Sequence, residues 1–137
     1  ERFMLAKILS AAALGIEALP VEIETDICNG MPKEQIVGLP DTAVKESVQR
    51  VRSALGNAGY PWPSNKRLTI NLAPADLPKD SGRFDLPIAL ALLVAGGHLQ
   101  ASALQGHIFA GELALNGDLR AVRATLPMVL ACASPRT

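Results

Sequence analysis

The sequence predicts an α+β fold of mixed α/β type, in which helices pack on a mixed sheet that contains hairpins. Three observations predict this class. Residues 21–27 alternate strictly between apolar or small side chains and acidic ones, which is the period of a half-buried strand. Residues 86–95 are apolar on every side, as is typical of a buried helix. Asn116-Gly117 lies between two strand-like runs and is a strong hairpin signal.

The first part of the chain is expected to form three strands. Residues 4–12 pair with residues 21–27 as a hairpin that turns within residues 15–20. The next segment, residues 29–32, contains Gly and Pro and reads as a turn. A short third strand is therefore expected at residues 35–39.

Residues 41–55 predict the first helix. Asp41 is placed to cap its free N–H groups, and Gly56 to Gly59 are expected to end it. Glu46 and Arg50 lie one turn apart and can form a weak pair. The apolar residues that recur at helical spacing form its buried face: Val44, Val48, Val51 and Leu55.

A strand at residues 66–72 leads into a long irregular loop, residues 73–84, and then into the buried helix. Asp85 is the expected cap of that helix. Pro87 falls in its first turn, where a missing N–H costs nothing. Long ordered loops of this kind usually serve a site or an interface.

The last third of the chain predicts a short strand, a hairpin and a final helix. A short strand is expected at residues 108–110, followed by a hairpin over residues 112–122 that turns at Asn116-Gly117. Thr125 then repeats the pattern of a cap followed by Leu and Pro, which predicts a final helix.

Composition predicts one globular domain. The chain has 137 residues, 49% of them hydrophobic and 19% charged, with a formal net charge of zero. A neutral chain carries no global signature of a nucleic-acid partner, although a local basic patch remains compatible with it. No apolar run approaches the ~20 residues of a membrane span. A cytoplasmic protein without a membrane partner is expected, with Cys28 and Cys132 as buried, reduced thiols.

The two ends of the chain suggest a piece of a longer protein. Met4 is the expected natural initiator, and residues 1–3 read as an addition ahead of it. The other end runs out of an apolar helical pattern, as a cut would. The predicted domain therefore spans residues 4–137.

No motif in the chain predicts catalysis or cofactor binding by this domain. The phosphate-binding patterns GxxxxGK[ST] and GxGxxG do not occur, so ATP hydrolysis by this chain alone is not expected. His98 and His107 lack carboxylate neighbours at ligand spacing, which predicts no metal site. We expect no catalytic residue, no metal and no cofactor in this part of the protein.

The loop at residues 73–84 holds the first group of candidate contact residues. Lys79 and Arg83 could contact phosphate or a neighbouring subunit, and a solvated loop with local ion pairs explains them equally well. Ser81 could act as a nucleophile with Lys79 as its base. Neighbours in a loop rarely converge in that way, so the dyad is disfavoured.

A second candidate surface lies on the first helix. Lys45, Gln49 and Arg52 share a face, and Lys66 and Arg67 follow nearby in the sequence. Such a face is most often simply solvated. Lys45, Arg52, Lys66 and Arg67 are nevertheless candidate contacts to DNA or to a neighbouring subunit.

Several segments together resemble the N-terminal domain of the ComM/YifB family of magnesium-chelatase-like AAA+ proteins. In unbroken order they cover most of the chain: residues 37–41, 44–47, 51–54, 69–79, 84–89 and 111–115. The resemblance implies a Lon-protease-like domain that precedes an AAA+ module, which would bind ATP and Mg²⁺ and is absent here. It also implies hexameric helicases that drive DNA branch migration during natural transformation.

The Lon-like loop departs from the pattern of active Lon peptidases. Those enzymes carry their serine in a Pro-Lys-Asp-Gly-Pro-Ser-Ala-Gly loop, whereas residues 78–85 here place Arg83 at the serine position. The catalytic lysine position falls on Leu126. Neither side chain can take over the role, because arginine does not attack carbonyls and leucine accepts no proton.

The resulting hypothesis is a non-catalytic domain for assembly and DNA engagement within a hexameric AAA+ helicase-like protein of DNA recombination and competence. Its expected partners are further copies in the full-length ring and single-stranded or branched DNA. One alternative is a degenerate Lon-type serine peptidase that uses Ser81. A magnesium chelatase subunit is the least favoured alternative.

Overall fold

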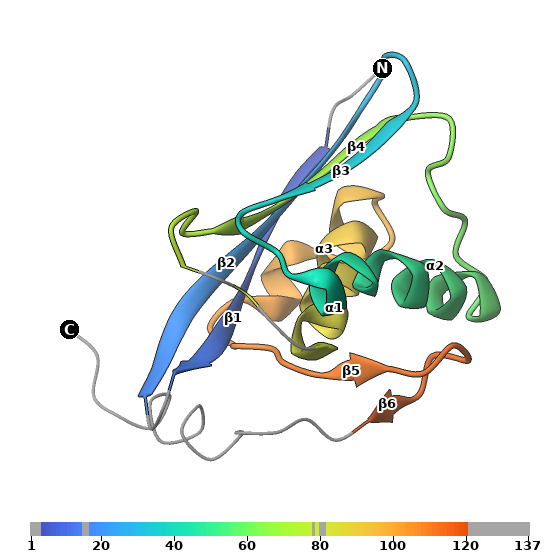
Figure 1. Cartoon of the computed structure of the whole chain (residues 1–137). Coiled ribbons are helices and arrows are strands. Elements are labelled where there is room, and N and C mark those ends of the chain that lie inside the picture. Colours follow the sequence, from blue (N-terminus) through green and yellow to red (C-terminus); the bar gives the residue numbers. More distant parts are fainter. Residues whose placement is uncertain (1–3, 15–16, 78, 80–81, 121–137) are drawn as a thin grey trace.

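The computed structural model describes residues 4–14, 17–77, 79 and 82–120, and it has a mixed sheet with helices on one face (Figure 1). The sheet contains β1 (Met4–Leu14), β2 (Glu17–Cys28), β3 (Lys33–Val37) and β4 (Arg67–Ala73), in the order β1-β2-β4-β3. β3 and β4 are parallel, and the other two pairs are antiparallel. The predicted α+β class with a mixed sheet is confirmed.

The predicted hairpin of β1 and β2 forms, but its turn is tighter than expected. Leu14 pairs with Glu17, so residues 17–20 belong to β2 rather than to the turn. Pro20 is tolerated in this strand because β4 pairs with β2 only from Glu22 onward. Before Glu22, β2 pairs with β1 alone, so on its other side no strand needs a backbone N–H at Pro20.

Three helices cover the sheet: α1 (Thr42–Lys45), α2 (Ser47–Asn57) and α3 (Asp85–Ala95) (Figure 1). α1 and α2 form the crossover between the parallel strands β3 and β4, a connection that parallel strands require. α3 packs against β1, β2 and α2. As the uniformly apolar sequence predicts, most of α3 is buried, and with the sheet it forms one core.

Two predicted element boundaries differ from the structure. The third strand covers Lys33–Val37 rather than residues 35–39, because Gly38 and Leu39 leave the extended conformation with φ of 105° and 56°. The first helix is divided at Glu46 into α1 and α2. Its apolar face is continuous across this division, since Val44 and Val51 are both buried.

The segment after α3 contains less regular strand than predicted. Residues 108–110 are irregular, and a single N–H of Phe109 donates to Leu9 O at 2.9 Å, which is too little pairing for a ladder. The hairpin at Asn116-Gly117 is confirmed by β5 (Glu112–Leu113) and β6 (Leu119–Arg120). Two short 3₁₀ helices, η1 (Gly82–Phe84) and η2 (Ala101–Leu104), precede it.

Some sequence-based expectations concern residues outside the described part of the chain. These are the end of the hairpin at Val122, the final helix from Thr125, Leu126, Cys132 and Ser81. Cys28 is described and carries a free thiol, although it is half-buried rather than buried. Among the described residues, no helix has the length and apolar character needed to cross a membrane.

Candidate functional site

The loop between β4 and α3 is fastened to the residues that precede α1. Lys79 N–H donates to Leu39 O at 3.1 Å, and Asp41 N–H donates to Lys79 O at 3.0 Å. Asp41 also caps α1 as predicted, because its Oδ1 accepts from Val44 N–H at 2.9 Å. The loop backbone is therefore held at the start of the first helix.

The side chain of Lys79 is directed inward from this loop. It is 0% exposed, and its Nζ donates to the carbonyl oxygen of Pro74. Burial lowers the pKa of Lys79 below its ordinary value, and the nearby charge of Asp76 partly opposes this effect. The Lys79 ammonium group is therefore bound inside the protein, and a contact of Lys79 with DNA or a neighbouring subunit stays a prediction.

Arg83 is also buried, with 6% of its surface exposed. It belongs to η1, and its carbonyl oxygen accepts from Gly111 N–H at 2.8 Å. Leu86 N–H donates to Gly111 O at 2.9 Å, so both the N–H and the carbonyl of Gly111 are hydrogen-bonded to the start of α3 and the residues just before it. Arg83 is therefore part of the packing between α3 and β5, and its contact with DNA or a neighbouring subunit stays a prediction.

Asp85 does not cap α3, in contrast to the sequence-based interpretation. The cap position is Phe84, and no side chain caps this helix end. The Asp85 carboxylate is fully buried and accepts from Arg50 Nε at 2.6 Å and Arg50 Nη2 at 3.1 Å. It also accepts from Leu113 N–H at 3.1 Å. Asp85 therefore accepts from the charged Arg50 side chain instead of capping the N–H groups of its own helix.

Arg50 connects several elements through this carboxylate. Besides its bonds to Asp85, Arg50 Nη2 donates to Ala43 O at 3.1 Å and to Ser47 Oγ at 3.3 Å. Arg50 Nη1 also lies 4.0 Å from Glu46 Oε1. The hydrogen bond to Asp85 raises the pKa of Arg50 against the lowering effect of burial, and the charges of Asp85, Glu112 and Glu46 add to the rise. Arg50 and Asp85 thereby join α1, α2, α3 and β5.

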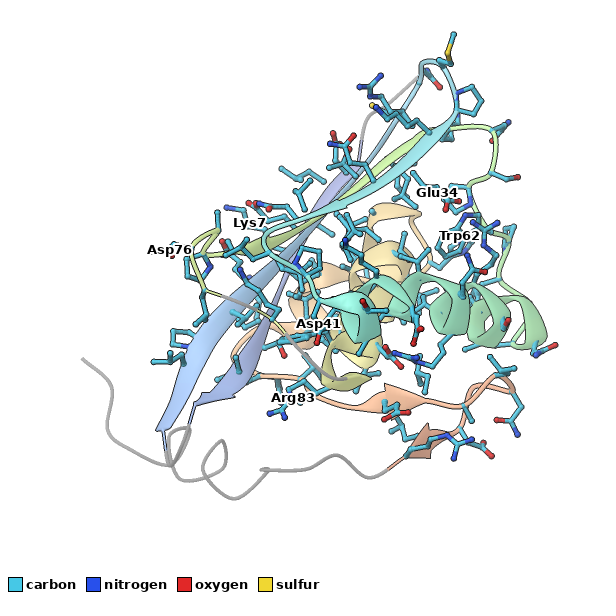
Figure 2. The ribbon with its side chains drawn as sticks, viewed as in Figure 1. Lys7, Glu34, Asp41, Trp62, Asp76 and Arg83 are labelled. Carbon is cyan, nitrogen blue, oxygen red and sulfur yellow. The ribbon has the colours of Figure 1, made fainter. Side chains whose placement is uncertain are left out.

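The other basic candidates divide into bound and exposed groups. Arg52 lies 4.6 Å from the centre of the Trp62 ring and pairs with Glu34, which also accepts from Trp62 Nε1 at 2.6 Å (Figure 2). Lys66 Nζ donates to Asn29 Oδ1 at 2.6 Å. Lys45 and Arg67 are exposed.

The structure adds Lys33 to the basic residues that sequence reasoning had selected. β3 and β4 pair in a register that sets Lys33 beside Arg67, and both side chains are exposed. With Lys66, which directly precedes β4 and accepts from Lys33 N–H at 3.4 Å, they form a basic cluster where these two strands begin. Like charges on neighbouring strands repel, so the arrangement favours an anionic partner. Only the strand register reveals it.

Clusters of metal ligands do not occur in the described residues: no three His, Cys, Asp or Glu side chains gather there in a way that could hold an ion. His107 Nδ1 lies 2.9 Å from Gln105 O, and His98 packs edge-on against Tyr60 with ring centres 5.3 Å apart. Fold and site thus define an α+β domain in which Lys79 and Asp85 are buried and bound internally, and in which Lys33, Lys66 and Arg67 gather at one end of the sheet.

Comparison with known proteins identifies the family. The family described as subunit ChlI of Mg-chelatase matches residues 23–136. The chain is 57% identical over 118 residues to the uncharacterized protein YifB of Salmonella typhimurium, covering 86% of this chain and 23% of that protein. It is 52% identical over 127 residues to the competence protein ComM of Haemophilus influenzae, covering 93% of this chain and 25% of that protein. The chain belongs to the magnesium-chelatase-like ComM/YifB family.

A relative of lower identity matches over the same length of this chain as ComM. The uncharacterized protein Rv2897c of Mycobacterium tuberculosis is 44% identical over 127 residues, covering 93% of this chain and 25% of that protein. The chain therefore spans about a quarter of the length of the curated relatives it matches.

Proposed function

We propose that this chain is a non-catalytic, Lon-protease-like domain for assembly and DNA engagement in a hexameric AAA+ helicase-like protein. The parent protein would use ATP and Mg²⁺ in a separate AAA+ module and drive DNA branch migration during natural transformation. The relative named competence protein ComM supports this assignment. Its similarity extends over 93% of the chain.

The observation that carries the scaffold part of the proposal is the internal use of the loop charges. Asp85 is bound by Arg50 and by Leu113 N–H, and Lys79 is bound by Pro74 O. The first two contacts join α3 to α2 and to β5, and the third lies within the loop between β4 and α3. Charged side chains that are bound internally in this way are typical of a structural framework.

The basic cluster of Lys33, Lys66 and Arg67 supports the DNA part of the proposal, and Lys45 is a further exposed cation on α1. Phosphate contacts dominate the affinity of proteins for DNA, and each one releases counterions. A local cluster can therefore bind DNA even though the chain has no net charge.

Fluorescence anisotropy with single-stranded and forked DNA across a salt series tests this assignment in the full-length protein and in this chain. The double variant Lys33→Ala/Arg67→Ala should reduce the slope of log K against log salt by roughly two, because two phosphate contacts are lost. Arg120→Ala, an exposed cation on β6, is the matched control and should leave the slope unchanged. An unchanged slope in the double variant would remove DNA contact from this cluster.

Ring assembly is tested separately by light scattering of the full-length protein after gel filtration. Deletion of this domain should convert a hexamer into smaller species, whereas the Lys33→Ala/Arg67→Ala variant should remain assembled. A hexamer that persists without the domain would contradict the assembly role.

One observation favours the peptidase alternative. Burial lowers the pKa of Lys79, and a lysine that acts as a base for serine needs such a lowered pKa. Incubation of the protein with casein, with Ser81→Ala and Lys79→Met as controls, separates the two functions. Cleavage that both variants abolish would establish a peptidase in place of a scaffold.

A further inference from the structure

A cavity of about 330 Å³ lies at the end of the molecule where β2, the C-terminal ends of α2 and α3, and the segment between α2 and β4 meet. In Figure 1 this segment runs from the end of α2 to the start of β4. Small-molecule sites commonly begin at about 300 Å³. The cavity therefore has room for one compact ligand.

The inner wall of the cavity is apolar. Leu55 on α2 and Leu92 on α3 are buried core residues, whereas Ile27 and Leu93 are only partly buried. All four line the cavity, so its wall is continuous with the hydrophobic core. An apolar group bound here would complete the burial of Ile27 and Leu93.

The rim is polar and carries positive charge without a carboxylate. Lys66 lies on one side, where Asn29 fixes its ammonium group at 2.6 Å. His98 lies on another side, where its ring packs against Tyr60. Among the described residues that line the cavity there is no Asp and no Glu. The rim therefore favours an anion over a cation.

The cavity is built from segments with fixed backbones. Pro61 and Pro63 hold the α2–β4 segment. The backbone ends of both helices are satisfied internally, since Tyr60 N–H donates to Leu55 O and His98 N–H donates to Leu93 O, both at 2.8 Å. A ligand would meet a preformed site and would cost little ordering of the protein.

From the apolar wall, the cationic rim and the volume together, we propose that this cavity binds a small amphipathic carboxylate. Its ring or branched chain packs on Leu55, Leu92 and Leu93, and its carboxylate is held by Lys66 and the ring N–H of His98. The site shares Lys66 with the basic cluster, whereas Lys33, Arg67 and Lys79 do not line it.

A titration of the ¹⁵N-labelled chain with 4-phenylbutyrate, followed by amide chemical shifts, tests the proposal. A probe of this size is expected to bind in the millimolar range, so the titration extends to about 20 mM. Saturable shifts should gather at Cys28, Tyr60, Leu93 and His98. The neutral amide of the same acid should bind at least about tenfold more weakly, because the charge at Lys66 no longer contributes.

Two variants and one control complete the test. Lys66→Met should raise the Kd for the acid about tenfold and leave the weak affinity for the amide unchanged. Leu93→Trp should fill the cavity and abolish the saturable shifts, with its melting temperature confirming that it folds. Lys45→Met, on α1 outside the cavity, should leave the Kd unchanged. Absence of saturable shifts, or equal affinity for acid and amide, would overturn the proposal.

Discussion

Among the described residues, Arg50 is the side chain that balances the charge of the Asp85 carboxylate. It is fully buried, and Arg50 supplies two of the hydrogen bonds that it accepts. A buried ion pair is weak evidence for net stability, since both ions lose hydration. Removal of one partner is nevertheless costly, because the remaining ion stays buried without its counter-charge.

Arg50→Met should therefore lower the free energy of unfolding by about 3–5 kcal/mol. The double variant Arg50→Met/Asp85→Leu should recover most of this loss, because it buries no uncompensated charge. Urea denaturation measures both values. Glu46→Gln removes the exposed carboxylate that lies 4.0 Å from Arg50, and it should change the free energy of unfolding by less than about 0.5 kcal/mol. A loss of similar size in Arg50→Met and Glu46→Gln would contradict this role of Asp85.

Lys79 makes a pH-dependent contribution to stability. Burial lowers its pKa in the folded protein, so above that lowered value the unfolded chain binds more protons at this site than the folded one. Stability from this group therefore rises with pH between the lowered pKa and the ordinary value of 10.5. Below the lowered pKa the burial of the charged amine counts fully against folding.

Lys79→Met removes this dependence. The free energy of unfolding of the wild type should rise relative to that of Lys79→Met as pH increases from neutral toward 10, and urea denaturation at several pH values measures the difference. A constant difference between wild type and Lys79→Met would show that the amine is not desolvated.

At the scale of elements, the passage from β3 to α1 depends on a close approach to β4. Gly38 has φ of 105°, and a Cβ there would overlap the carbonyl oxygen of Leu72. Gly59, which follows α2, also has a positive φ of 91°, but a Cβ there would meet no atom within 4 Å. The two glycines thus share the backbone requirement and differ in the space around them.

Gly38→Ala should be much more destabilising than Gly59→Ala. Both variants carry a backbone cost of roughly 1 kcal/mol or more, and only Gly38→Ala adds an overpacking cost of about 1–3 kcal/mol against β4. Thermal or urea denaturation of the two variants under the same conditions measures this difference. Equal losses would mean that β3 and β4 can separate at no cost.

At the scale of the whole molecule, the sheet and the helices share one hydrophobic core. Trp62, the single tryptophan, packs against this core from the segment between α2 and β4. We expect urea unfolding followed by Trp62 emission and by far-UV circular dichroism to give one common midpoint. Two separate midpoints would indicate that the α2–β4 segment unfolds independently of the sheet.

The sequence by itself determined the features that depend on near neighbours along the chain. The alternation in residues 21–27, the apolar run in residues 86–95, the cap at Asp41 and the Asn116-Gly117 turn all formed as predicted. Short-range sterics and local burial govern such features, and both can be read from the spacing of residue types. The family resemblance also came from the sequence alone.

Only the tertiary structure decided how charges meet across elements. Asp85 has the sequence context of a helix cap, yet Arg50 lies close enough to bind it although 35 positions separate them. Lys79 looks solvated in the sequence, yet its loop packs against the start of α1 and buries it. Lys33 and Arg67 become neighbours through the register of β3 and β4. Such pairings depend on the packing of whole elements, which residue spacing does not encode.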